Sequence, residues 1–443
     1  MNTEKLNTAG LNTVAMLEKQ HNWAGNYTYS AARLHYPETV AQVQALVRAS
    51  HKLRVLGSRH SFNSIADSTE DLVSLERFDP VGVIDHERHT VTVAGGVRYG
   101  QLCEQLQREG YALPNMASLP HISIAGACAT ATHGSGDHNG SLATSVSALE
   151  LVTADGEVVV LSRDQQPDQL QGAIVGLGGL GVVTHLMLDL LPSFQMRQNV
   201  YENLSLAQVE AHFDEIMASA YSVSLFTDWR SAMFNQVWLK RRVVEGSPFE
   251  ADPEFFGATR ALTPLHPIRG ISAVTCTEQM GIPGAWYERL PHFRLEFTPS
   301  SGDELQSEYI VPREHAIAAL QTIDRLRDVV TPLLQISEVR TIAADTLWMS
   351  PFYQQPCMAI HLTWQKNEPA VKQVLPIIEE ALAAFNARPH WGKVFTMPAA
   401  RVQTLYEKMP DFQRLLNTYD PQGKFRNAFL DTYIFGEIGR AHV

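Results

Sequence analysis

The sequence predicts a two-lobed α+β fold, and three observations lead to it. The chain has 443 residues, which is more than one hydrophobic core usually organises. Its first 190 residues or so read as short helices and strands, whereas residues 195–400 carry aromatic, strand-like runs and two longer helices. We expect one domain over residues 1–194, a second over 195–410, and a C-terminal segment over 411–443 that returns to the first.

The first domain is expected to begin with a helix over residues 36–50, with Pro37 at its first position, and a strand over 53–57. Two strands follow in residues 81–97, and a helix over 99–110 ends at Gly110. Residues 145–162 form a hairpin whose turn is Asp155-Gly156. These elements are short and mixed, as an α+β domain requires.

In the second domain, aromatic-rich runs predict strands over residues 221–229, 234–242 and 293–301. Helical spacing predicts helices over residues 313–330 and 368–387. Residues 245–270 are rich in Pro and Gly and are expected to form a long surface loop. The densest basic cluster, "LKRR" at 239–242, is expected to be a solvated strand end.

Composition excludes several classes of protein. Apolar residues make up 45% of the chain and charged residues 19%, which is typical of a soluble globular protein. A net charge of −12 disfavours general affinity for nucleic acid or anionic membranes, and no apolar run approaches the ~20 residues that span a bilayer. The first 20 residues lack a secretory signal pattern, and the four cysteines are scattered, which favours free thiols. We expect a cytoplasmic monomer.

The motif "GLGGLG" at residues 176–181 matches the dinucleotide-binding pattern GxGxxG. In a Rossmann fold this pattern must open a helix, whose N–H groups hold a pyrophosphate. Here it precedes "VVTHLMLDL", which alternates like a strand. The context therefore argues against a Rossmann site.

Two other loops are more informative. Residues 114–136 form a long loop rich in Gly, Ala, Ser and Thr with few bulky side chains, and residues 57–61 form the tight turn "GSRHS". Small residues allow backbone N–H groups to approach a phosphate closely. Each loop alone could simply pack on itself, but together they suggest a pyrophosphate cradle. Neither a metal site nor a GxSxG hydrolase fits, because metal-ligand spacing and the nucleophile motif are both missing.

Polar residues at strand spacing stand out in the second domain. Glu338 and Arg340 are two residues apart, as are His361 and Thr363, and Lys393 follows in "HWGK". A single such pair would be read as a salt bridge on a solvated strand face. Two pairs and a lysine form a denser set, suited to a ligand with many hydroxyl groups.

These features together resemble the vanillyl-alcohol-oxidase superfamily of FAD enzymes, and within it the bacterial alditol oxidases. The resemblance runs in order through almost the whole chain. The matching segments are residues 22–26, 55–63, 113–136, 150–156, 220–230, 276–284, 290–302, 387–395 and 420–429. It departs at Arg59, where a glycine is expected before the histidine, and this puts the local turn geometry in question.

The resemblance implies an FAD-binding lobe of the PCMH type and a substrate-binding cap lobe with a large antiparallel sheet. It also implies that His60 carries FAD covalently, through an imidazole nitrogen bonded to the flavin 8α-methyl group. The other FAD-binding residues that it implies are Val55, Leu56, Gly57, Ser58, Arg59, Ser61, Ser118, Ser123, Gly126, Thr130, Ala131, Thr132, His133, Gly181, Val183 and His390.

The activity that the resemblance implies is oxidation of the terminal hydroxyl of an alditol, such as xylitol or sorbitol, to an aldose, with O₂ reduced to H₂O₂. Arg340 and Lys393 would stabilise the developing alkoxide, and His361 would accept the proton. Glu338 would orient Arg340 and accept substrate hydrogen bonds, together with Ser118 and Thr363. Two alternatives remain: an aldonolactone oxidase or dehydrogenase of the same superfamily, and a non-catalytic sugar-binding flavoprotein. The intact polar set argues against the second.

Overall fold

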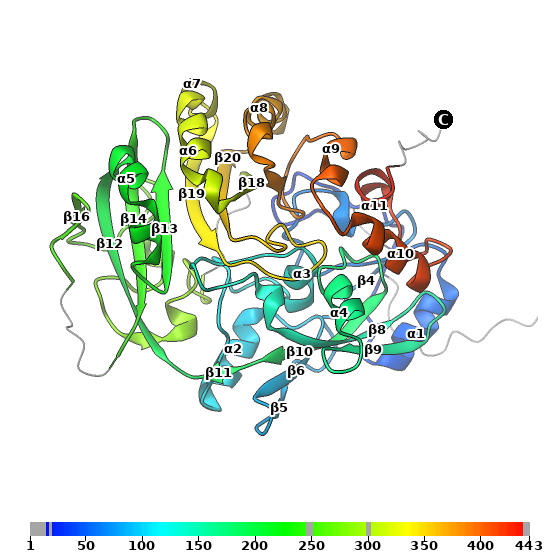
Figure 1. Ribbon diagram of the computed structural model, residues 1–443. Coiled ribbons are helices and arrows are strands. Elements are labelled where there is room, and N and C mark those ends of the chain that lie inside the picture. Colours follow the sequence, from blue (N-terminus) through cyan, green and yellow to red (C-terminus); the bar gives the residue numbers. More distant parts are fainter. Residues whose placement is uncertain (1–14, 17–19, 245–250, 298–302, 437–443) are drawn as a thin grey trace, which may run out of the picture.

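A computed structural model describes residues 15–16, 20–244, 251–297 and 303–436. Two bodies share the chain (Figure 1): one contains the N-terminal strands and the C-terminal helices, and the other is built on a large sheet. This is the expected two-lobed α+β architecture. None of the helices in the described ranges is long and apolar enough to cross a bilayer.

The first body contains three small sheets. A four-stranded sheet has the order β1-β2-β4-β3, a five-stranded antiparallel sheet has the order β5-β6-β10-β8-β9, and β11 pairs with β7. The strands are β1 (Ala15–Met16), β2 (Arg33–His35), β3 (Leu53–Val55), β4 (Asp71–Val73), β5 (Val83–Asp85), β6 (Thr90–Ala94), β7 (Tyr111–Ala112), β8 (Val146–Val152), β9 (Val158–Ser162), β10 (Val182–Asp189) and β11 (Leu191–Pro192).

Several predicted elements of this body are confirmed. Helix α2 (Tyr99–Arg108) is followed by Gly110 at φ +80°, and β8 and β9 form the hairpin around Asp155-Gly156. The remaining helices are α1 (Val40–Ala49), α3 (Ile124–Ala129) and α4 (Pro167–Ile174), with short 3-10 turns at Ser64–Ala66 and Leu142–Ser145.

The expected start of the first helix is wrong. Helix α1 begins at Val40, and Pro37 lies ahead of the N-cap residue, Thr39. The backbone of Thr39 is extended, and its hydroxyl accepts a hydrogen bond from the N–H of Gln42. Threonine is a favoured N-cap, so this interaction rather than the proline sets the first residue of the helix.

The segment "GLGGLG" leads into strand β10, as predicted, and not into a helix. Side chains along β10 are alternately buried and half-buried, so the strand covers the core with one face. The buried guanidinium of Arg54 donates to the carbonyls of Leu177 and Gly178 at 2.7 Å each. The motif therefore forms a fixed loop without a helix N-terminus.

The second body is a ten-stranded antiparallel sheet. Nine of its strands follow the order β15-β16-β12-β14-β13-β19-β20-β18-β21. The tenth, β17, pairs with β12 in addition to these neighbours. The strands are β12 (Gln195–Ser205), β13 (Ser222–Thr227), β14 (Met233–Arg242), β15 (Glu254–Phe255), β16 (Ala258–Arg260), β17 (Gly284–Ala285), β18 (Glu304–Pro312), β19 (Leu334–Ile342), β20 (Cys357–Gln365) and β21 (Arg388–Pro389). The predicted large antiparallel sheet is confirmed.

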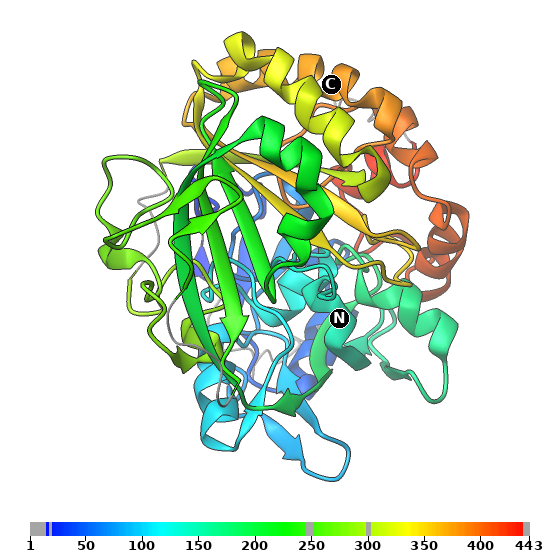
Figure 2. The ribbon, with the colours of Figure 1, turned by 60° about the vertical axis from the view of Figure 1, so that its left-hand side comes forward.

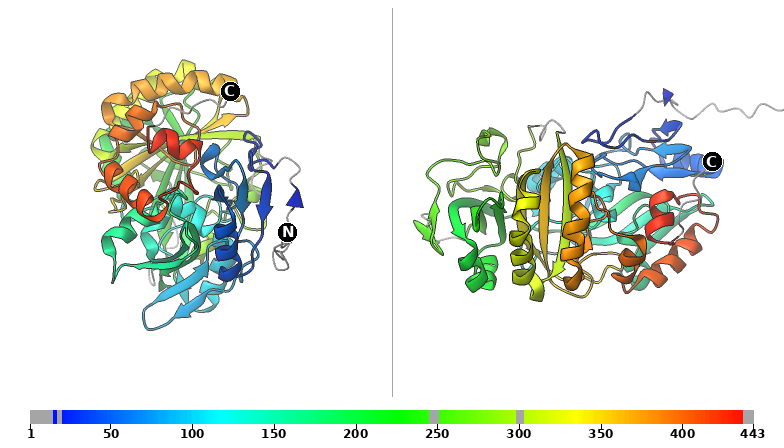
Figure 3. Two further views of the ribbon diagram at one scale, coloured as in Figure 1. Left: turned by 90° about the vertical axis from the view of Figure 1, so that its right-hand side faces the viewer. Right: turned by 90° about the horizontal axis from the view of Figure 1, so that it is seen from above.

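Helices cover one face of this sheet (Figures 2 and 3), and the helices predicted over 313–330 and 368–387 are among them. They are α5 (Leu206–Ala218), α6 (Ala316–Arg325), α7 (Arg327–Val330) and α8 (Glu368–Ala381). Alternate strand residues such as Val339, Ile360 and Leu362 pack with these helices in one hydrophobic core. Because side chains alternate along a strand, the residues between them project from the opposite face.

Three predictions in this body fail. Residues 293–297 form no strand beyond an isolated bridge between Phe293 and Cys276, and residues 298–302 lie outside the described part of the chain. The strand is β18 instead, whose mixed polar sequence hid it. Residues 251–270 are not all loop, because β15 and β16 pair at the edge of the sheet. Lys240, expected on a solvated strand end, is only 1% exposed.

Three helices end the described chain: α9 (Ala399–Thr404), α10 (Met409–Tyr419) and α11 (Ala428–Tyr433). Phe412, Leu416 and Phe429 belong to the same hydrophobic core as the strands β8 and β10. The C-terminal region thus packs on the first body (Figure 1). The division at residues 194 and 410 stays a prediction.

Candidate active site

A cavity of about 840 Å³ is lined by residues from both bodies. The first body contributes its small-residue loops, and the second contributes the sheet face that the helices leave free. Nearly every residue that the sequence predicted lines it, namely Val55, Leu56, Gly57, Ser58, Arg59, His60, Ser61, Ser118, Ser123, Gly126, Thr130, Thr132, His133, Gly181, Val183, Glu338, Arg340, His361, Thr363, His390 and Lys393. Ala131 is the exception: it is fully buried and turns the backbone between two lining threonines.

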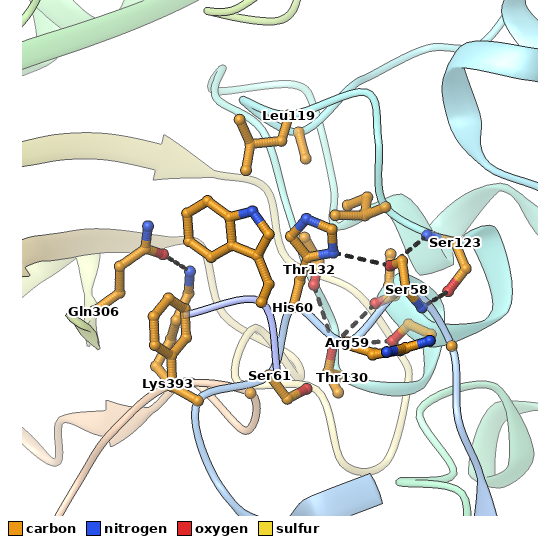
Figure 4. A pocket seen from close by; sticks show the side chains of 18 of the residues that line it. Ser58, Arg59, His60, Ser61, Leu119, Ser123, Thr130, Thr132, Gln306 and Lys393 are labelled. Atoms are coloured by element: carbon orange, nitrogen blue, oxygen red, sulfur yellow. Dashed lines mark hydrogen bonds between the residues drawn. The ribbon is translucent and has the colours of Figure 1, made fainter. Parts of the chain in front are cut away.

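The two loops are joined directly to each other. The N–H of Ser123 donates to Oγ of Ser58 at 3.0 Å, and the N–H of Ser58 donates to Oγ of Ser123 at 3.4 Å (Figure 4). A Cβ atom added to Gly57 would lie 2.5 Å from the same Ser123 oxygen, so a larger residue here would force the side chain of Ser123 to shift. The small residues therefore bring two backbone segments together along the wall of the cavity. This arrangement fits the expected dinucleotide cradle.

His60 projects from the turn at one end of these loops (Figure 4). Its ring stacks on Trp23 with centroids 5.5 Å apart, and its Nδ1 lies 3.1 Å from Oγ of Ser58. Burial, together with the positive charges of Lys393 and Arg98, lowers the pKa of His60 to about 4. The imidazole is therefore neutral at physiological pH, the form in which a ring nitrogen is nucleophilic.

Arg59 adopts a left-handed backbone conformation with φ 63°. Glycine is the residue that adopts this region without strain, which matches the expectation of a glycine at this position. The side chain donates to Oε1 of Gln20, and the carbonyl accepts from the N–H of Trp23 at 2.8 Å. The turn before His60 therefore holds an arginine in a backbone conformation that favours glycine.

On the opposite wall of the cavity, three residues lie side by side on three adjacent strands of the sheet. Glu308 on β18 lies opposite His361 on β20, which in turn lies opposite Glu338 on β19. Cross-strand neighbours project from the same face, so all three side chains are brought together with Arg340 and Thr363. The sheet register thus assembles the polar set that the sequence predicted.

Glu308 is the residue that sequence reasoning missed. Its carboxylate is buried and lies 2.6 Å from Nη2 of Arg340, 3.2 Å from Nε2 of His133 and 3.4 Å from Nδ1 of His361. The spacing of Glu304, Gln306 and Glu308 by two residues was a signal that could have found it. Glu308 connects the loops of the first body to the sheet of the second.

The charges in this cluster stabilise one another. Burial alone would raise the pKa of Glu308 and of Glu338, but Arg340 and the neighbouring histidines outweigh burial and lower both. Burial disfavours the charge of Arg340, yet the two carboxylates raise its pKa. Chiefly through burial, the pKa of His361 is lowered. The site thus combines ionised Glu308, Glu338 and Arg340 with a neutral His361.

Lys393 lies beside Gln306 and donates to its Oε1 (Figure 4). Burial lowers the pKa of this lysine to about 8, although the charge of Glu308 opposes the change. Its Nζ also lies 5.2 Å from the ring centroid of Phe62, a cation–π contact. Lys393 therefore supplies a positive charge near the junction of the two walls.

Ser118 lies where the small-residue loop meets the second body. Its carbonyl accepts from the N–H groups of His292 and Phe293, at 3.1 and 3.3 Å. These hydrogen bonds fix the loop against the segment that leads to His292. Ser118 therefore lines the cavity from a backbone that both bodies hold in place.

Comparison with known proteins identifies the class. Residues 31–162 match the model of an FAD binding domain, and residues 303–433 match that of D-arabinono-1,4-lactone oxidase. A cholesterol oxidase from B. sterolicum superimposes with a TM-score of 0.78 over 98% of this chain and 100% of its own, at 13% identity. The protein is an FAD-dependent oxidoreductase with a vanillyl-alcohol-oxidase-type fold, and the residues around the cavity fit that cofactor.

Sequence comparison narrows the class further. An alditol oxidase of Streptomyces sp. is 49% identical over 94% of this chain and 99% of its own length. L-gulono-1,4-lactone dehydrogenase of Mycobacterium tuberculosis is 27% identical over 92% and 97%. The chain belongs to the alditol oxidase family.

Proposed function

We propose that this protein oxidises the terminal primary hydroxyl of alditols, such as xylitol and sorbitol, to aldoses, with O₂ reduced to H₂O₂. The observation that carries the proposal is the 49% identity to an alditol oxidase over nearly the full length of both chains. The polar set on the free face of the sheet supports it, because it offers donors and acceptors for several hydroxyl groups. We further propose a cytoplasmic monomer, with no nucleic acid or membrane partner.

FAD is held, in this proposal, along the loops of the first body and tethered covalently to His60. A neutral imidazole supports the tether, since one of its two ring nitrogens then has a free lone pair and can act as the nucleophile. When bound, FAD would supply a two-electron acceptor for the alcohol, and O₂ would be the final oxidant.

The residues of the opposite wall then orient the substrate and manage its proton. Neutral His361 accepts the hydroxyl proton, while Arg340 and Lys393 stabilise the developing alkoxide. Glu338 accepts hydrogen bonds from the remaining hydroxyl groups, and the hydroxyl groups of Ser118 and Thr363 both accept and donate them. Glu308 holds Arg340 and positions His361.

A second candidate function is oxidation of an aldonolactone. The match of residues 303–433 to the D-arabinono-1,4-lactone oxidase model favours it. A lactone is cyclic and presents fewer free hydroxyl groups than an open-chain alditol, so a wall of many polar groups suits it less well.

The experiment that separates these functions is a peroxide-release assay across xylitol, sorbitol, mannitol, glycerol and a series of aldonolactones. We expect the alditols to give the higher kcat/KM. Higher kcat/KM for a lactone would overturn the proposed substrate. A yellow protein that oxidises none of them would favour a non-catalytic sugar-binding flavoprotein.

A further inference from the structure

Behind the cavity wall, a buried lysine connects to the site through a histidine. Nζ of Lys240, on strand β14, lies 2.6 Å from the carbonyl of Leu290, 2.8 Å from that of Pro291 and 3.1 Å from Nδ1 of His292. Nε2 of His292 lies 2.7 Å from Oε1 of Glu338. Lys240, His292 and Glu338 are 1%, 5% and 5% exposed, so water does not compete for these contacts.

When Lys240 is protonated, the donors and acceptors along this chain of contacts fix which nitrogen of His292 carries a proton. An ammonium group has three donors and no acceptor, and Lys240 has three acceptors around it. Nδ1 of His292 must then accept, so the neutral ring carries its proton on Nε2 and donates it to Glu338. This donation needs an accepting oxygen on Glu338, which its carboxylate, kept ionised by Arg340 and His292, provides.

We propose that Lys240 is a positioning residue that fixes the Nε2–H tautomer of His292 and so keeps Glu338 ionised and oriented for substrate hydroxyl groups. This inference rests on the proposed function, because it takes Glu338 as the acceptor for a polyol. Lys240 does not line the cavity, whereas His292 and Glu338 do, so the lysine acts through the histidine.

The charges around Lys240 support this arrangement. Burial lowers its pKa to about 7, while Glu338 and Cys276 favour the ammonium and Arg289 and Arg340 oppose it. Burial also lowers the pKa of His292 to about 4, so the ring is neutral near neutral pH. The tautomer, and not the charge of the histidine, is therefore what the lysine controls.

The effect on Glu338 is specific to one of its oxygens. Oε1 accepts from His292 and lies 3.6 Å from Nε of Arg340. Among the described residues, none forms a hydrogen bond with Oε2. Oε2 is thus the oxygen left to accept from a substrate, and its direction depends on how Oε1 is held.

The test uses the flavin-loaded protein with ¹⁵N-labelled histidine. We expect His292 of the wild type to show an acceptor-type Nδ1 and a protonated Nε2 between the pKa of His292, about 4, and that of Lys240, about 7, with the signal assigned by its loss in His292→Gln. Lys240→Met should change this signature. It should also raise KM for xylitol by about tenfold, with a smaller change in kcat, since one charge-assisted acceptor is misplaced.

If Lys240→Met folds poorly, the pair His292→Gln and His292→Leu still tests the inference. His292→Gln retains an acceptor for Lys240 and a donor for Glu338, so it should restore most of the xylitol affinity that His292→Leu loses. Arg241→Met is the matched control, because the next residue of β14 projects from the other face of the sheet. Flavin absorbance and thermal unfolding report whether each variant is folded.

The outcomes separate the inference from the proposed function. A protonated Nδ1 or a doubly protonated ring in the wild type overturns the inference, as does an unchanged KM in Lys240→Met with an altered tautomer. If no alditol is oxidised but Lys240→Met changes the expected tautomer of His292, then the proposed function fails while the control of the tautomer by Lys240 stands.

Discussion

Arg340 pairs with Glu308 and not chiefly with Glu338, its neighbour two residues back on the same strand. Nη2 of Arg340 lies 2.6 Å from Oε1 of Glu308, whereas its Nε lies 3.6 Å from Oε1 of Glu338. The two carboxylates therefore have different principal partners. Glu308 holds the guanidinium, and Glu338 is held by His292.

This division predicts that Glu308→Gln impairs flavin reduction nearly as much as Arg340→Ala. The buried guanidinium would lose its closest counter-charge and its orientation, and from oxyanion-type precedents we expect a loss on the order of 10²–10³ in kcat. Stopped-flow flavin reduction measures it, with FAD content as the control because Glu308 is on the substrate wall. Near wild-type reduction in either variant would remove these residues from the mechanism.

The sequence could predict those features that depend on local chemistry. The turn at His60, the small-residue loops and the pairs Glu338/Arg340 and His361/Thr363 follow from residue type and strand spacing alone. The structure brings nearly all of these residues to one cavity.

Strand spacing could mark Glu308 as part of a polar strand face but could not place it at the site, and it could not reveal that Lys240 is buried. Glu308 faces the site because β18 pairs beside β20, and no local pattern reveals which strands become neighbours. The run "LKRR" looks like a solvated strand end, yet its lysine, Lys240, is buried. Its ammonium donates to the carbonyls of Leu290 and Pro291, which lie 50 and 51 residues further along the chain. Long-range pairing decided both positions.

The covalent tether gives a simple prediction. Flavin should remain with the polypeptide after acid denaturation of the wild type, because a covalent bond survives unfolding. His60→Ala should release all of its flavin under the same conditions. Absorbance of the precipitated and soluble fractions measures this. Complete release from the wild type would show that the cofactor is not covalently bound.

The backbone at Arg59 predicts a stability difference between two variants. Both Arg59→Gly and Arg59→Ala lose the hydrogen bond to Gln20, but only glycine removes the strain of a Cβ atom at φ 63°. We expect Arg59→Gly to be about 1 kcal/mol more stable than Arg59→Ala. Chemical denaturation of the two loaded proteins measures the difference. Equal stability would mean that the turn carries no strain.

Lys393 predicts the alkaline side of the activity profile. Its pKa is lowered to about 8 by burial, so the ammonium is present below that pH and is lost as the pH rises through it. The rate of flavin reduction should therefore fall above about pH 8. Lys393→Ala should lose a factor on the order of 10²–10³ and lack this alkaline decline. An identical decline in the alanine variant would assign it to another group.

Glu338 predicts how activity depends on the length of the substrate. A carboxylate is acceptor-only, and charge-assisted hydrogen bonds contribute roughly 1.5–3 kcal/mol each, so added hydroxyl groups should strengthen binding. We expect kcat/KM to climb from ethylene glycol through glycerol to the five- and six-carbon alditols. The increase should end when the groups near Glu338, Ser118 and Thr363 are filled.

Glu338→Gln tests this dependence directly. The amide oxygen can still accept from Nε2 of His292, so the other arm then presents an NH₂ donor where the carboxylate presented an acceptor. The gain in kcat/KM with chain length should flatten, and kcat should fall modestly because Oε1 also lies near Arg340. Thr363→Val is the matched comparison, since it removes one neutral hydroxyl and should lower the increase by less. A chain-length dependence as steep in Glu338→Gln as in the wild type would show that another residue recognises the polyol.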